Sequence, residues 1–336
     1  MTIKDIARES GYSVSTVSRV LNNRRDVSPE AKKKIDEIVA VHNFVPNNNA
    51  KHLKQITSKT IIAMVKGHSN MLFFDIVEEI QKTVEKSKYT LEVSYLDEDD
   101  NEVEQALILC RERKPLGLLF LGGNPQLFQE AFKSIKVPSV LVTTDSSRLS
   151  FQNLSSVTTD DISASECAVD YLIQSGHQKI GIIGGDKSSF NTSSQRYQGC
   201  LNSFEKNRIP FLEEKQFVKA RFAYDSAYRA MNHLLEKAPD ITAVFAMSDV
   251  MAIGAIRAIL DAHLEVPKDI SVIGFDGIAM ADYANPKLTT IRQQYKTIAS
   301  RSVEILFNAI DLKTSAVHEI IPFELACGES VRKVLK

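Results

Sequence analysis

Residues 2–22 read TIKDIARESGYSVSTVSRVLN, a stretch that predicts two short helices joined by a tight turn. Thr2 is placed to cap the first helix, and Gly11 stands at the turn, where a Cβ atom is disfavoured. In the second helix Val17 and Val20 fall on one face, which can pack against the first helix. This pattern is a helix-turn-helix, whose second helix enters the major groove of DNA.

The outer side of the second helix carries small and polar residues that are free to meet a base edge. The residues expected to contact DNA from this segment are Thr2, Ser13, Val14, Ser15, Thr16, Ser18, Arg19 and Asn22. A third helix is expected from Ser28-Pro29-Glu30, which combines a capping hydroxyl, a proline at the first helical position and an acid in the first turn.

Charge is divided unevenly along the chain. The whole sequence has 41 Lys and Arg against 42 Asp and Glu, but residues 1–60 have 11 bases against six acids, a net of +5. Residues 61–336 therefore have 30 bases against 36 acids, a net of −6. The positive charge lies at the end expected to face phosphates, which supports DNA binding by that end.

Length and composition limit the remaining architecture. A chain of 336 residues, 43% hydrophobic, leaves room for two further domains after a module of about 58 residues. No stretch approaches the ~20 apolar residues of a membrane span, so we expect no membrane association and a cytoplasmic protein. The four cysteines, at 110, 167, 200 and 327, are far apart and predict neither a metal site nor disulfides.

From residue 60 onward, short apolar runs alternate with amphipathic stretches. Runs of this kind are typical of strands buried on both faces of a parallel sheet. The expected strands are 60–65, 116–121, 139–142, 179–183, 243–247 and 270–275, and the expected helices are 76–86, 164–174, 227–236 and 251–262. The alternation predicts doubly wound parallel-sheet α/β domains after the all-α N-terminal domain.

Several motifs resemble the LacI/GalR family of bacterial transcriptional repressors. IKDIA at 3–7 and TVSRVLN at 16–22 match the start of the family pattern, and FVPNNNAKHLK at 44–54 is similar to the family's hinge. Similar motifs also stand at 176–180, 248–254, 267–276 and 286–291.

The resemblance implies a helix-turn-helix DNA-binding domain over 1–45, a hinge over 46–58, and an effector-binding and dimerisation core of periplasmic-binding-protein type over 59–336. Family members cross three times between two core subdomains. This implies an N-subdomain of about 59–160 and 291–321 and a C-subdomain of about 161–290 and 322–336.

The resemblance also implies a homodimer on a near-palindromic double-stranded operator. The hinge residues implied to contact DNA are Ala50, Lys51, Leu53 and Lys54. Leu53 would wedge into the minor groove and bend the duplex.

A ligand cleft is expected at the carboxyl ends of the strands, between the subdomains. A polyhydroxylated ligand calls for paired hydrogen bonds from Asp, Asn and Arg and for an aromatic face. From strand ends and from the resemblance, the expected effector-binding residues are Phe73, Phe74, Asp145, Asn191, Ser193, Arg196, Phe222, Asp249 and Asp276. A sugar or glycoside is the expected effector, because the arginine and tryptophan of purine-responsive relatives are missing near Phe190 and Ser147. The sequence leaves open whether the effector releases or tightens DNA.

Several common catalytic and nucleotide-binding motifs are absent. The stretch around Gly184-Gly185 lacks the spacing of a phosphate-binding loop, and no nucleophile elbow or His-Glu-x-x-His pair occurs. We therefore expect a regulator that is not an enzyme and has no cofactor. Two alternatives remain: a solute-binding or sugar-processing protein with a vestigial basic arm, and a regulator controlled by a partner protein.

Overall fold

The computed structural model describes residues 3–21, 24, 27–42, 59–67, 70–187 and 191–334, with the side chain of Lys4 left out. The chain divides into two compact units, Met1–Thr57 and Ser58–Lys336. The contacts predicted for Thr2, Asn22, Ala50, Lys51, Leu53 and Lys54 lie outside the described residues.

The first unit contains the three predicted helices. They are α1 (Ile3–Ser10), α2 (Val14–Leu21) and α3 (Pro29–Val41). Gly11 has φ +75°, the left-handed conformation that the turn was expected to need. Ser28 caps α3 by accepting a hydrogen bond from the Ala31 amide. The small core contains Ile6, Val17 and Ile35, one from each helix and each fully buried, so the helix-turn-helix prediction is confirmed.

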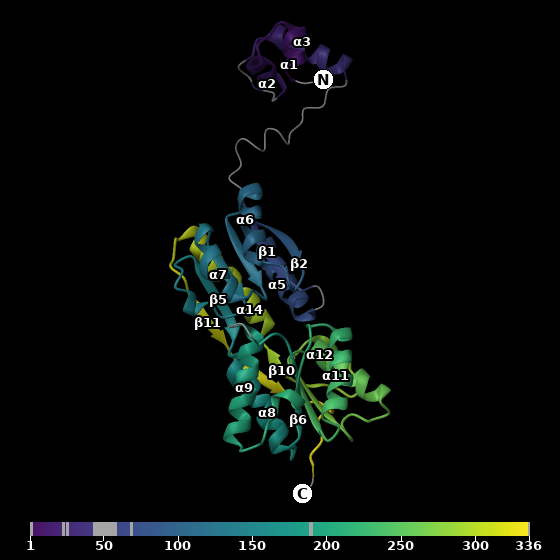
Figure 1. Ribbon diagram of the computed structural model, residues 1–336. Coiled ribbons are helices and arrows are strands. Elements are labelled where there is room, and N and C mark those ends of the chain that lie inside the picture. The colour runs from purple at the N-terminus through teal and green to yellow at the C-terminus, as the bar shows by residue number, and fades with distance from the viewer. Residues whose placement is uncertain are drawn as a thin grey trace. The chain divides into compact units, whose positions relative to one another are not determined.

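The second unit is built on two six-stranded sheets, each flanked by helices (Figure 1). The first sheet has the strand order β11-β5-β4-β3-β1-β2, and all of its strand pairs are parallel. Its strands are β1 (Thr60–Lys66), β2 (Thr90–Leu96), β3 (Gly117–Leu121), β4 (Ser139–Val142), β5 (Leu154–Thr159) and β11 (His318–Ile321).

Two different apolar layers cover this first sheet. Consecutive strand residues point to opposite faces of the sheet. Ile61 and Ile62, for example, are both fully buried but belong to separate apolar clusters on opposite faces. Helices α5 (Met71–Glu85) and α14 (Tyr295–Asp311) pack on one face, and α6 (Glu102–Arg113) and α7 (Pro125–Ala131) supply the other. Short 3-10 turns occur at Phe132–Ser134 and Ser147–Leu149.

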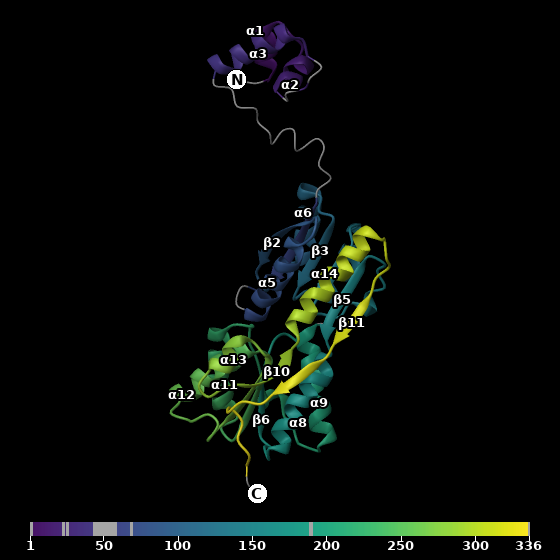
Figure 2. The ribbon, with the colours of Figure 1, turned by 180° about the vertical axis from the view of Figure 1, so that it is seen from behind.

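The second sheet has the order β12-β10-β9-β8-β6-β7, with β12 antiparallel to β10 and the other pairs parallel. Its strands are β6 (Ile180–Gly184), β7 (Phe217–Lys219), β8 (Ala243–Ala246), β9 (Ser271–Asp276), β10 (Thr289–Gln293) and β12 (Phe323–Ala326). Its helices are α8 (Asp161–Gln174), α9 (Thr192–Lys206), α10 (Glu213–Gln216), α11 (Tyr224–Lys237), α12 (Asp249–Asp261) and α13 (Ala279–Tyr283). Figures 1 and 2 place the α8–α9 pair and the α11–α12 pair on opposite sides of this sheet.

The chain passes between the two sheets three times. It leaves the first sheet after Thr159, returns after Gln293, and leaves again between Ile321 and Phe323 (Figure 2). We call the part built on the first sheet the N-subdomain and the part built on the second the C-subdomain. All three passages leave or enter strands at the same end of the two strand orders: β5 and β11 in one sheet, β10 and β12 in the other.

The six predicted strands are all present, and six further strands were not predicted. The missed strands include β5, whose sequence LSSVTT reads as polar although every residue in it is buried. Side-chain hydrogen bonds make this burial possible. Ser156 Oγ lies 2.8 Å from the His318 ring, and the Thr159 hydroxyl donates to the Gln293 side chain at 2.9 Å.

His177 has a structural role. Its ring is buried, with Nδ1 2.9 Å from the Thr242 hydroxyl and Nε2 3.2 Å from the Arg332 carbonyl. Burial lowers the pKa of this imidazole.

In the described part of the chain, no helix combines the length and apolar character needed to cross a bilayer.

Candidate functional site

The candidate DNA-reading surface is the outer face of α2. Val17 and Val20 are buried toward the other helices, whereas Ser15 and Arg19 are exposed and Val14 is 45% exposed. Val14 does not belong to the apolar core that the described residues of this unit form. A small apolar group beside hydroxyls is suited to reading a thymine methyl and base-edge polar atoms.

The start of α2 is held by the hydroxyl of Ser13. Its Oγ accepts from the Thr16 amide at 3.1 Å and lies 2.9 Å from the Thr16 hydroxyl. Ser13 is therefore occupied as a helix cap, although its side chain stays exposed. On α3, Lys32, Lys33 and Lys34 are all exposed and add to the basic character of this unit.

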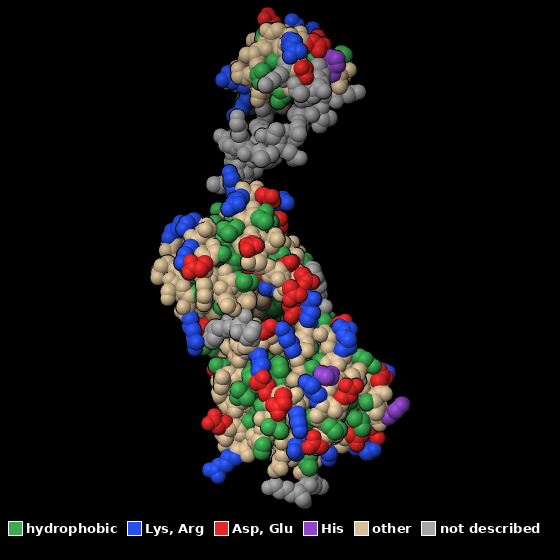
Figure 3. All heavy atoms as spheres, viewed as in Figure 1, with side chains coloured by type: hydrophobic (Ala, Val, Ile, Leu, Met, Phe, Trp, Pro, Cys, Tyr) green, Lys and Arg blue, Asp and Glu red, His purple; other side chains and the backbone are tan. Residues whose placement is uncertain are grey.

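The candidate effector site is a cavity of about 670 Å³ between the two subdomains. Its wall combines strand ends and loops of the N-subdomain with loops and helix starts of the C-subdomain. Acidic and basic side chains lie next to one another along the junction of the subdomains (Figure 3). A cavity of this size and position is suited to a small molecule.

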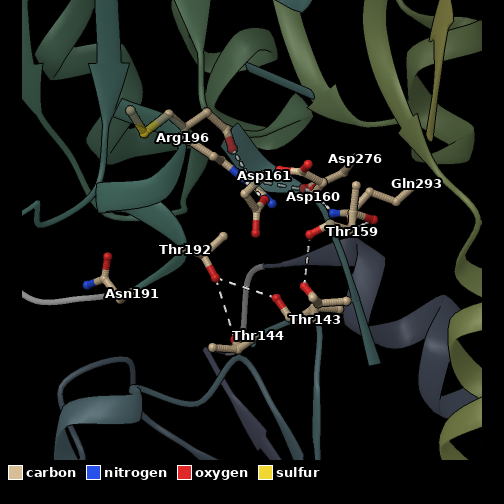
Figure 4. A network of polar contacts seen from close by, with 12 residues as sticks. Thr143, Thr144, Thr159, Asp160, Asp161, Asn191, Thr192, Arg196, Asp276 and Gln293 are labelled. Carbon is tan, nitrogen blue, oxygen red and sulfur yellow. Dashed lines mark hydrogen bonds and ion pairs between the residues drawn. The ribbon is translucent and has the colours of Figure 1, made fainter. Parts of the chain in front are cut away.

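A buried guanidinium organises the inner end of the cavity (Figure 4). Arg196, in α9, is 4% exposed, and its Nε donates to Asp161 at 2.8 Å. Its Nη1 donates to the Met247 carbonyl and lies 3.8 Å from Asp276 Oδ1. Its charged carbon lies 3.6 Å from the centre of the Phe275 ring. Arg196 is thus held in one orientation by three different kinds of contact.

Asp276 ends β9 and is part of the cavity lining. Its Oδ1 accepts from the Gln293 amide group at 2.9 Å, while Oδ2 is buried and has no partner among the described residues. Its backbone has φ +113°, a conformation rarely adopted outside glycine and found most often at functional sites. Burial raises the pKa of Asp276 to about 6, although Arg196 and Gln293 act in the opposite direction. A carboxylate oxygen in this state is well suited to accept a hydrogen bond from a ligand hydroxyl.

Two phenylalanines provide apolar wall. Phe73 lies in the first turn of α5, which Asn70 caps, and Phe222 lies between β7 and α11. The space around Phe222 requires a glycine nearby: a Cβ at Gly185 would lie 2.8 Å from its ring and 2.3 Å from Ser193 Oγ. The cavity therefore pairs ring surfaces with converging polar groups.

Six of the nine expected effector-binding residues line this cavity. They are Phe73, Asn191, Ser193, Arg196, Phe222 and Asp276.

The structure puts the other three elsewhere. Phe74, one residue further along α5, does not line the cavity, is 49% exposed and has its ring centre 6.2 Å from that of Tyr95. Asp145 accepts from the Ser147 amide at 2.9 Å and holds the turn that follows β4. Asp249 is fully buried, where it accepts from the Ile278 amide and the Thr290 hydroxyl, and burial together with Asp276 raises its pKa. Phe74 is therefore a half-exposed surface residue, Asp145 a turn residue and Asp249 a core residue, and none of the three lines the cavity.

Other lining residues were not expected. They include Lys66, Asp97, Glu98, Asp99, Thr143, Arg221 and Gln293. Asp97, Glu98 and Asp99 follow β2, a strand that was not predicted, so its end could not be used to locate them. The acidic run DEDD at 97–100 was the available signal.

A polar contact between the subdomains lies beside the cavity. The Thr192 hydroxyl, at the start of α9, is 3.5 Å from both the Thr143 carbonyl and the Thr144 hydroxyl after β4 (Figure 4).

Within the described residues, no group of three or more His, Cys, Asp and Glu side chains is arranged to hold a metal ion.

Comparison with known proteins agrees with this geometry. Residues 2–47 match the family described as bacterial regulatory proteins, lacI family, and residues 169–331 match a periplasmic binding protein-like domain. The HTH-type transcriptional regulator MalR of Clostridium butyricum is 37% identical, with 98% of this chain and 99% of the relative covered.

Two further comparisons cover almost the whole chain. The probable HTH-type transcriptional repressor ExuR of Bacillus subtilis (strain 168) is 32% identical over 99% of both chains. A solved transcriptional regulator CelR–cellobiose complex has a TM-score of 0.71 and 25% identity, with 98% of this chain and 99% of that chain covered. With a DNA-reading helix unit joined to a two-subdomain sensor, the chain belongs to the LacI family of bacterial transcriptional regulators, which bind operator DNA under the control of small-molecule effectors.

Proposed function

We propose that this regulator represses carbohydrate-utilisation genes and that its effector is a sugar or glycoside bound in the cavity between the subdomains. The observation that carries the proposal is that Arg196 and Asp276 line the cavity together: Nη1 of Arg196 lies 3.8 Å from Oδ1 of Asp276, and Oδ2 of Asp276 has no partner among the described residues. An acceptor and a donor held side by side can bind neighbouring hydroxyl groups with paired, charge-assisted hydrogen bonds.

The walls fit the same class of ligand. Phe73 and Phe222 offer ring faces for the apolar side of a sugar, and Asn191 and Gln293 add amide groups that both donate and accept. The cellobiose named in the complex of the similar regulator belongs to this class. We infer that the cavity binds its ligand without transforming it, so the protein acts as a sensor and not as an enzyme.

The effector is best identified by a thermal-shift screen of hexoses, pentoses and disaccharides on the full chain. A ligand at a hundred times its Kd should stabilise the folded state by about 2.7 kcal/mol. The stabilising sugar is then added to the complex with a duplex selected from random sequences by the protein, and the anisotropy of the labelled duplex reports release or tightening.

Two results would contradict the proposal separately. If no duplex is selected and the protein has no measurable affinity for DNA at low salt, the regulator function is wrong and a solute-binding protein is favoured. If DNA binds specifically but no sugar changes the stability or the DNA affinity, the effector class is wrong. In that case a partner protein becomes the candidate signal.

We further propose that the protein acts in the cytoplasm as a homodimer. Exposed apolar side chains of both subdomains support the homodimer. Phe74 and Tyr95 of the N-subdomain are 49% and 42% exposed, and Tyr283 of the C-subdomain is 83% exposed. Two helix-turn-helix units would then read the two halves of a near-palindromic operator.

Sedimentation velocity tests the dimer with a matched pair of variants. Phe74→Asp should shift the protein toward the monomer, because a charge would be buried in the interface. Leu212→Asp, at a residue that is 50% exposed and outside this surface, should leave the mass unchanged. A wild-type monomer at micromolar concentration would overturn the proposal.

A further inference from the structure

Among the described residues, each basic side chain that lines the effector cavity is paired with an acid. Two of the five bases are held from behind the wall: Lys66 donates to Glu102 at 2.7 Å, and Arg196 donates to Asp161 at 2.8 Å. The partners Glu102 and Asp161 are buried and are not themselves part of the lining. Neither base can turn to a new anion without leaving a buried carboxylate uncompensated.

The other three bases are paired on the cavity surface. Lys219 binds Asp186, and Arg229 binds Asp225 at 2.9 Å. The third is Arg221. In the described part of the wall, five bases thus lie among six acids. The two buried acids behind the wall bring the acids to three more than the bases.

Arg221 is held by three acids of the opposite subdomain. It lies between β7 and α11, and its guanidinium binds Asp97, with Glu98 at 3.4 Å and Asp99 at 3.3 Å. Glu98 also accepts a hydrogen bond from the backbone of Phe222. The acidic loop after β2 therefore surrounds Arg221, which reaches the cavity from the segment between β7 and α11.

A planar guanidinium is the group best suited to bind a phosphate or carboxylate in two places at once. In this cavity its donors face carboxylates instead. An anionic ligand would have to displace one of these carboxylates and then lie among an excess of negative charge. A neutral polyol meets neither obstacle, because hydroxyl groups can donate to the acids and accept from the bases.

We propose that the cavity selects an uncharged saccharide over an anionic one, and that Asp97, Glu98 and Asp99 set this selectivity by occupying Arg221. The inference rests on the proposed sugar-sensing function and specifies its ligand class. It assigns Arg221 a latent anion-binding ability that the three acids suppress.

The test measures, by calorimetry on the full chain, the ratio of affinities for a neutral disaccharide and its own 6-phosphate. The probes are maltose, cellobiose and trehalose, each paired with its 6-phosphate. Disaccharides are used because a single hexose would fill roughly a quarter of the cavity at protein packing density. The wild type should prefer the neutral member of a bound pair by ~10-fold or more.

The central variant is Asp97→Asn, Glu98→Gln and Asp99→Asn combined. Asn at position 97 keeps the side-chain oxygen that accepts from the Asp99 amide at 3.1 Å, so the loop can hold its turn. With Arg221 released, the preference for the neutral sugar should fall by roughly 3- to 10-fold, a modest range because these side chains are partly exposed to solvent.

Three controls separate released charge from other effects. Glu112→Gln, Glu130→Gln and Glu205→Gln combined makes the same change in net charge at exposed positions away from the cavity, and should leave the ratio unchanged. Arg221→Gln breaks the same ion pairs without releasing a cation, and should also keep the preference. Asp99→Asn alone, at a side chain 84% exposed, gives a smaller fall in the ratio if the triple variant does not fold.

The outcomes are distinct. Equal or tighter binding of a 6-phosphate by the wild type overturns the inference, as does an unchanged ratio in a folded Asp97–Asp99 variant. If neither member of any pair binds while specific DNA binding is intact, the proposed sugar effector fails, and the inference fails with it.

Discussion

Replacing Asp276 with Asn should make the sensor more stable and less able to bind its effector. The carboxyl group is buried, its Oδ1 accepts from Gln293, and its Oδ2 has no partner among the described residues. In Asp276→Asn the amide oxygen can keep the Gln293 hydrogen bond. The amide nitrogen then replaces Oδ2, an acceptor, with a donor.

The size of the stability effect follows from the pKa of Asp276. Burial raises it from 3.8 to about 6, so the folded state holds a proton that the unfolded state has lost. A raised carboxyl pKa contributes stability below the unfolded value, and this contribution is lost as the pH rises through the folded value. About 2 pKa units correspond to about 3 kcal/mol in total, of which about 1.4 kcal/mol falls between pH 5 and pH 7.5.

Urea unfolding of wild type and Asp276→Asn at pH 5 and pH 7.5, without effector, measures this difference. The free energy of unfolding of the variant relative to the wild type should rise by about 1.4 kcal/mol between the two pH values. At pH 7.5, calorimetry should show the effector affinity reduced by ~10-fold or more, as expected for loss of a charged hydrogen bond.

The reasoning is refuted if the relative stability of the variant falls or stays constant as the pH rises. That result would mean that burial does not raise the pKa of Asp276, and that its ionised carboxylate does not destabilise the folded state at neutral pH. Wild-type effector affinity in the stable variant would place the ligand away from Asp276.

Three other substitutions test the remaining parts of the protein. Arg19→Ala should weaken binding to a selected operator strongly while leaving effector binding unchanged; equal operator affinity in a gel-shift titration would remove Arg19 from the interface. Leu53→Ala, predicted from the hinge motif, should reduce specific binding far more than non-specific binding; equal losses on operator and random duplex would argue for a general phosphate contact instead. Arg196→Ala should lower the free energy of unfolding by about 3–5 kcal/mol, because it leaves Asp161 and Asp276 buried without a counter-charge. A wild-type urea midpoint would show that stability does not depend on these ion pairs.

Local sequence signals predicted the DNA-binding unit well. Gly11 and Ser28 perform the turn and cap that their chemistry indicated, because such effects depend only on neighbours in the chain. The same kind of signal failed for β5. A strand rich in serine and threonine is buried here only because Gln293 and His318, more than a hundred residues away, complete its hydrogen bonds.

In the candidate effector site, too, local sequence signals identified some residues, whereas contacts between distant residues could not be predicted. Arg196 and Asp276 were found from a motif resemblance and a strand end. The pairing of Arg221 with Asp97 could not be found, since it joins residues 124 positions apart across two subdomains. Phe73 and Phe74 were indistinguishable in sequence; the start of α5 at Met71, after the cap Asn70, decides which of them lines the cavity.

The three passages between the sheets and the Arg221 contact lie at opposite ends of the strand orders. The passages use β5, β10, β11 and β12, whereas Arg221 and its acids follow the far edge strands β7 and β2. Four strand spacings of about 4.8 Å separate β5 from β2, which gives a lever arm of ~19 Å. A rotation of about 10° around the β5 side would move the β2 edge by ~3 Å, enough to part an ion pair. The pivot itself would hardly shift, so a ligand spanning from Arg196 to the far edge would set the angle between the two subdomains.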